Sequence, residues 1–106
     1  MAPIERITMF KIPNDGDRER LLEQYKVLAK TAVKDGKPYI QSLAVGPIVS
    51  NPRAKGYTLA VKSTFATLDD MNYYDTECAA HVALKAVARP LCDPEDILTA
   101  YYESVL

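Results

Sequence analysis

Apolar and polar residues alternate in two stretches of the chain, 4–12 and 57–65, which is the pattern of strands that bury one face. The first stretch, "IERITMFKI" (4–12), is also rich in β-branched isoleucine, which strands favour. Two further strands are predicted at 39–46 and 57–65, and a last one within 95–106, around Ile97 to Tyr102.

Residues 18–34 follow a helical period instead, with apolar residues spaced to form one continuous stripe. Asp17 is predicted to cap the start of this helix, and Gly36 is predicted to end it. The stripe consists of Leu21, Leu22, Tyr25, Leu28, Ala29, Ala32 and Val33.

Two shorter helical segments follow the third strand. Thr67 is predicted to cap a helix over 68–74. Two aspartates fall in the first turn of this helix, where the helix dipole favours negative charge. A second piece is predicted at 78–88, ending before Pro90.

The order of these elements is β-α-β-β-α-β, which predicts an α+β, ferredoxin-like domain spanning residues 1–106. In that fold an antiparallel four-stranded sheet carries its helices on one face. One face of the third strand carries Tyr57, Leu59, Val61, Ser63 and Phe65, and the other carries smaller, weakly charged residues. A sheet face left open in so small a domain needs a cover, so we expect a homodimer formed through the open sheet face.

Composition narrows the range of partners. The chain of 106 residues carries 13 basic and 14 acidic residues and has no basic run, so neither nucleic acid nor a membrane surface is an expected partner. The start of the chain lacks the pattern of a signal peptide, and two cysteines make no disulfide framework, so we expect a cytoplasmic protein. One histidine and two scattered cysteines do not predict a metal site, and no cofactor motif is present.

The single histidine, His81, lies on or beside the apolar side of the helix at 78–88. One interpretation is a packed histidine bonded to a backbone carbonyl. The other is a general base, because an imidazole titrates near neutral pH. Tyr74 and Tyr73 precede it, and a phenol can orient a carbonyl group, although tyrosines at helix ends more often serve packing.

The segment "GYTLAVKSTFATLDDMNYY" followed by "AAHVALK" resembles the stress-responsive A/B barrel (Dabb, dimeric α/β-barrel) family. Further matches to the family pattern are Phe10 and Lys11 at the end of the first strand and "SLAVG" (42–46) in the second. The resemblance covers about residues 4–102 and implies the ferredoxin-like homodimer.

A plant polyketide cyclase of this family, which forms olivetolic acid without a cofactor, uses a histidine and a tyrosine. The resemblance assigns the catalytic histidine to His81 and the catalytic tyrosine to Tyr74. Because this chain has one extra residue between the two positions, Tyr73 is a possible substitute for Tyr74. The cyclase pocket contains two more histidines, and the corresponding positions of this chain carry Arg6 and Leu59 instead. We expect a pocket between the two main helices and the sheet, with Arg6 and the apolar side chains of Tyr25, Leu59, Val61 and Leu84 binding a ligand.

Three functions are consistent with these observations. The first is a homodimeric protein that binds a small apolar or aromatic molecule without converting it. The second is a cofactor-free enzyme of the cyclase or aldol type, in which His81 removes a proton next to a carbonyl and Tyr74 holds the carbonyl oxygen. A monooxygenase of the same superfold, acting on haem or a quinol, has weaker support.

Overall fold

Four strands pair into one antiparallel sheet in the computed structural model, which describes residues 2–106. They lie in the order β2-β3-β1-β4, so the first strand is central and the second and fourth strands form the edges. The strands are β1 (Ile4–Phe10), β2 (Ile40–Pro47), β3 (Leu59–Phe65) and β4 (Ile97–Glu103).

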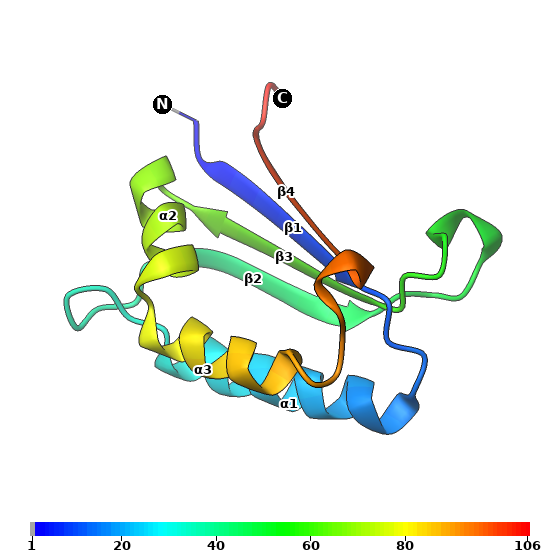
Figure 1. Ribbon diagram of the computed structural model, residues 1–106. Coiled ribbons are helices and arrows are strands. Elements are labelled where there is room, and N and C mark those ends of the chain that lie inside the picture. The colour runs from blue at the N-terminus through cyan, green and yellow to red at the C-terminus, as the bar shows by residue number, and fades with distance from the viewer. Residues whose placement is uncertain (1) are drawn as a thin grey trace.

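The helices gather on one face of this sheet (Figure 1). Helix α1 (Asp15–Thr31) lies beside α3 (Ala79–Ala88), and α2 (Leu68–Thr76) leads directly into α3. Short 3₁₀ turns at Pro52–Ala54 and Pro94–Asp96 interrupt the loops before β3 and β4. The predicted α+β, ferredoxin-like order is therefore confirmed, with its second helical unit divided in two.

The ends of α1 differ from the prediction. Asn14, not Asp17, caps the helix: its side-chain oxygen accepts a hydrogen bond from the Asp17 backbone N–H at 3.0 Å. The helix ends at Thr31, well before Gly36. Gly36 instead occupies a turn between Lys34 and Lys37, where its φ of 75° is easily adopted by glycine.

Strand and helix ends elsewhere shift by one or two residues. Strand β1 stops at Phe10 because the Ile12 N–H donates to the Thr58 hydroxyl at 2.9 Å and not to a neighbouring strand. Helix α2 continues to Thr76, and Cys78 caps α3 without belonging to it.

Alternation along the central strands determines what is buried. Inward-facing side chains of β1 and β3 pack under α1 and α3. In β3 these are the predicted Leu59, Val61, Ser63 and Phe65, whereas Tyr57 lies before the strand and is half-buried. The outward side carries Ile7 and Met9 of β1 and has no helix above it (Figure 1). The largest side chains that are fully buried are Tyr74, Phe65, Ile12, Leu21, Leu28, Leu59, Met71 and Val61.

Strand β4 is covered on neither side. Every residue from Leu98 to Glu103 is exposed, including Tyr101, which is 55 % exposed although it points to the helix-bearing side. The helix layer therefore stops short of this edge, and the inner face of β4 borders the buried interior next to β1.

Candidate functional site

Four polar side chains are buried in the interior: Arg6, Thr8, Ser63 and His81. Three come from the inner faces of β1 and β3, and His81 comes from α3. Together with Asp75 of α2 they form a group that we call the polar cluster. Buried polar groups are normally hydrogen-bonded, because a buried group without a partner costs free energy.

The sheet register brings the cluster together. Side chains alternate along β1, so Arg6 and Thr8 face inward together with the apolar residues Ile4 and Phe10. Arg6 lies directly opposite Ser63 of β3 on one side and opposite Tyr101 of β4 on the other. Directly opposed residues of antiparallel strands are close neighbours on the same face.

Arg6 is the buried charge of the cluster, with only 7 % of its surface exposed. One terminal nitrogen donates to the Thr8 hydroxyl at 2.8 Å, and the other pairs with the Asp75 carboxylate at 2.8 Å. The guanidinium carbon also lies 5.2 Å from the centre of the Tyr74 ring. The Asp75 pairing makes this buried charge tolerable, but the Arg6 Nε atom has no partner within residues 2–106.

His81 is fixed by a ring contact and one hydrogen bond. Its imidazole stacks on the Tyr74 ring with the centres 3.8 Å apart and the planes 14° from parallel. Its Nδ1 lies 2.8 Å from the Tyr74 backbone carbonyl oxygen. Because a carbonyl can only accept, Nδ1 must carry the proton, which leaves the lone pair on Nε2.

The environment keeps His81 uncharged. Burial lowers the pKa of His81 from 6.5 to about 4, which outweighs the opposite effect of the hydrogen bond to Tyr74. The positive charges of Lys85 and Arg6 lower it further. His81 is therefore neutral at pH 7, and its hydrogen bond to the described residues is made by Nδ1 and leaves Nε2 free.

The two candidate tyrosines are placed differently. Tyr74 is 1 % exposed, burial raises the pKa of its phenol, and its hydroxyl makes no hydrogen bond within residues 2–106. Tyr73 points away from His81: its hydroxyl donates to the Val33 carbonyl at 3.3 Å, and its ring packs on Tyr39. The structure thus brings Tyr74 to His81, through stacked rings and not through the hydroxyl.

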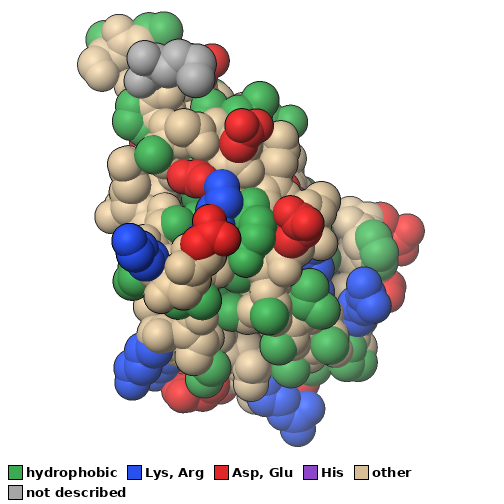
Figure 2. All heavy atoms as spheres, turned by 90° about the vertical axis from the view of Figure 1, so that its left-hand side faces the viewer, with side chains coloured by type: hydrophobic (Ala, Val, Ile, Leu, Met, Phe, Trp, Pro, Cys, Tyr) green, Lys and Arg blue, Asp and Glu red, His purple; other side chains and the backbone are tan. Residues whose placement is uncertain are grey.

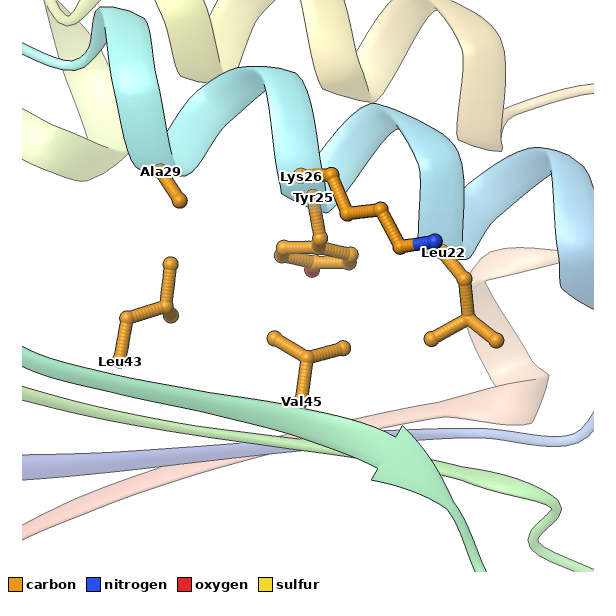
Figure 3. Close-up of a pocket in the computed structure, with 6 residues that line it drawn as sticks. All are labelled: Leu22, Tyr25, Lys26, Ala29, Leu43 and Val45. Carbon is orange, nitrogen blue, oxygen red and sulfur yellow. The ribbon is translucent and has the colours of Figure 1, made fainter.

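A hollow of about 200 Å³ lies between α1 and β2, and Figure 3 shows the Tyr25 ring at its centre. Side chains of Leu43 and Val45 rise from β2 toward the helix, opposite Ala29. We call this the α1–β2 hollow; its lining residues are Leu22, Tyr25, Lys26, Ala29, Leu43 and Val45.

Of the predicted apolar pocket residues, Tyr25 lines this hollow. Leu59, Val61 and Leu84 are instead at most 2 % exposed within the core. Sequence reasoning missed Leu43 and Val45, although the alternation of the second predicted strand could have indicated that they face the helices.

The surface around α2 covers the His81 side chain of the polar cluster. Figure 2 views this end of the molecule, where acidic and basic side chains are interspersed and no histidine surface is visible. This agrees with His81 being 4 % exposed. Within residues 2–106 no three potential metal ligands of the His, Cys, Asp or Glu type gather, and no helix there is long and apolar enough to cross a membrane.

Comparisons with known proteins bear on the family and the fold. Residues 4–103 match the sequence profile of the family described as the stress responsive A/B barrel domain. A "Fusaristatin A biosynthesis cluster protein" from Gibberella zeae is 45 % identical over 84 residues, 79 % of this chain. The aligned region spans only 61 % of that relative's length.

Two solved structures share the fold at low identity. A dimeric ferredoxin-like protein of unknown function from Jannaschia sp. CCS1 has a TM-score of 0.76 at 16 % identity, covering 96 % of this chain and 99 % of its own. The hydroxynitrile lyase from Passiflora edulis has a TM-score of 0.77 at 17 % identity, covering 97 % and 94 %. These likenesses establish the ferredoxin-like fold.

Proposed function

This chain belongs to the stress responsive A/B barrel domain family, and from that premise we propose that it is a homodimer that binds a small apolar or aromatic molecule. The observation that carries the proposal is the α1–β2 hollow. Its walls are mainly apolar and include the Tyr25 ring, while Lys26 lies at its rim, already paired with Glu23 at 2.8 Å. Such a lining suits an apolar or aromatic ring.

The relative from Gibberella zeae supports a small molecule as the ligand, because its name places it in a biosynthesis cluster. We therefore propose that the ligand is an intermediate or product of small-molecule biosynthesis.

The homodimer is supported by the open face of the sheet. Two hollows of about 390 and 440 Å³ lie on that face, lined mostly by apolar groups that include Ile7, Ala60, Met9 and Leu98. A second copy related by twofold symmetry would fill both and remove the apolar surface from water. The fold neighbour from Jannaschia sp. CCS1 is itself described as dimeric.

Indole is a suitable probe of the α1–β2 hollow. Titration should shift the methyl NMR signals of Leu43 and Val45 saturably in the wild-type protein. Ala29→Trp should abolish the response, because the new ring occupies the hollow. The matched control Ala86→Trp adds the same ring at an exposed position of α3 and should respond like wild type. An equal response in Ala29→Trp, or none in wild type, would contradict the proposal.

A second candidate, a cofactor-free enzyme, is favoured by the state of His81. A neutral imidazole with its Nε2 lone pair unpaired has the form that a general base requires at pH 7. In this proposal Nε2 accepts a proton from the carbon next to a carbonyl, and the Tyr74 hydroxyl holds the carbonyl oxygen. With a pKa of about 4 the base is always available but weak, so slow exchange is expected.

Deuterium exchange into phenylacetone in D₂O tests this second candidate. Wild-type protein should accelerate exchange above buffer, and His81→Gln should abolish the acceleration. Tyr74→Phe should reduce it, whereas the control Tyr73→Phe should not, because the Tyr73 hydroxyl points to Val33. A His81→Gln protein as active as wild type would exclude the general-base role.

A further inference from the structure

Arg6 Nε and Ser63 Oγ are buried donors of the polar cluster that have no hydrogen-bond partner within residues 2–106. Arg6 and Ser63 face each other across β1 and β3 and share the inner face of the sheet. A third unpaired atom, Tyr39 Oη, belongs to an aromatic contact outside the cluster. We propose that Arg6 Nε and Ser63 Oγ together bind a carboxylate group of a ligand.

Unpaired buried donors of this kind are rare, because each loses its hydrogen bonds to water without replacement. Arg6 is 7 % exposed and Ser63 is 1 % exposed, so bulk solvent does not hydrogen-bond to Arg6 Nε or Ser63 Oγ. A guanidinium offers two parallel N–H groups along each edge, a geometry that matches a carboxylate. Asp75 contacts a single terminal nitrogen and leaves Nε free.

The charges of the cluster also favour an anion. Arg6 and the adjacent Lys85, which lies outside the cluster, are both positive, whereas Asp75 is the one acidic member of the cluster. Lys85 donates to the Asp75 backbone carbonyl and not to its carboxylate, so its charge is not neutralised there. His81 is neutral at pH 7, so one incoming carboxylate would balance the remaining positive charge.

The uncovered inner face of β4 provides an approach to the site. Tyr101, the neighbour of Arg6 in the register, is 55 % exposed, and the Asp75 side chain is 32 % exposed. In this proposal the ligand approaches Arg6 between α2 and β4, past these two exposed side chains. This site differs from the α1–β2 hollow. It adjoins Tyr74 and His81, the residues of the second candidate function, but does not depend on their catalysing a reaction.

Acetate is the probe, since it is the smallest stable carboxylate that carries a methyl group. The ¹H–¹⁵N signal of Arg6 Nε should shift saturably with acetate and not with chloride at equal ionic strength. Ser63→Ala should weaken binding about tenfold, because one hydrogen bond to the anion is lost. Asp75→Asn should strengthen it about tenfold, because a competing carboxylate is removed. The control Asp70→Asn, whose native carboxylate pairs with Lys34, should leave affinity unchanged.

An Arg6 Nε signal that does not shift with acetate would overturn the proposal. A saturable shift unaffected by both Ser63→Ala and Asp75→Asn would also overturn it, because binding would then lie elsewhere. The Ala29→Trp protein separates this site from the hollow: it should lose its response to indole and keep its response to acetate.

Discussion

At the scale of single residues, burial determines what His81 can do. The ring is held between α3 and the Tyr74 ring, and the hydrogen bond from Nδ1 fixes its tautomer. The same burial that keeps Nε2 free as a base also makes it a weak one. Packing and chemistry are therefore not exclusive interpretations of this residue.

The lowered pKa of His81 predicts a pH-dependent stability. Between pH 6.5 and about 4 the unfolded chain binds a proton at His81 that the folded protein does not bind. The buried, neutral His81 therefore contributes fully to the free energy of unfolding above pH 6.5, and this contribution is lost as the pH falls toward 4. The loss should reach roughly 3 kcal/mol.

Urea unfolding at pH 7, 5.5 and 4, at one protein concentration, measures this loss. His81→Gln should remove that part of the pH dependence, so the difference between the two proteins isolates it from the titration of carboxylates. An NMR titration midpoint of His81 near 6.5 would show that the imidazole is hydrated and would contradict the prediction.

At the scale of elements, helix α1 begins at a cap that the sequence pattern did not single out. Asn14 and Asp17 are both common capping residues, and both precede the apolar stripe. The backbone decides between them: Asn14 is extended, with φ −84° and ψ 124°, whereas Asp17 already lies within the first helical turn. Asp17 then contributes a favourable charge near the positive end of the helix dipole.

Substitution distinguishes the two roles. Asn14→Ala should lower the free energy of unfolding by about 1 kcal/mol, because the Asp17 N–H loses its acceptor. Asp17→Ala, which removes a charge–dipole interaction and an exposed ion pair with Arg20 at 3.6 Å, should cost about half as much or less. Chemical unfolding at pH 7 measures both, and the reverse order of the two losses would contradict the assignment of the cap.

At the scale of the whole molecule, the sheet is covered on one face only (Figure 1). The open face combines apolar side chains from β1, β3 and β4 with few charges, such as Lys62 of β3. An exposed apolar sheet face of this kind is what a twofold symmetric partner would cover.

Ile7→Lys tests the homodimer. Wild-type protein should sediment at twice the monomer mass at micromolar concentration. The variant should be monomeric, because twofold symmetry places two new lysines in one interface. The control Val82→Lys introduces the same charge at an exposed position of α3 and should remain dimeric. A monomeric wild-type protein would contradict the proposal directly.

The sequence by itself determined the order of the elements and most of what is buried in the central strands and α1. Alternation in β1 and β3 and the helical stripe in α1 are local periodicities that survive folding because each element buries one side. Element ends were less certain, because capping depends on backbone angles that several neighbouring residues could adopt. His81 is a candidate from its residue type and its place on the helix, whereas Arg6 is a candidate from the family resemblance.

Only the tertiary structure decided which of these residues meet. The register of β1 with β3 placed Arg6 opposite Ser63, and the turn from α2 to α3 placed the Tyr74 ring, not the Tyr73 ring, on His81. It also left Leu59 inside the core and opened the hollow at β2 instead. Contacts between residues far apart in the chain depend on register and helix placement, which a periodicity along the sequence does not specify.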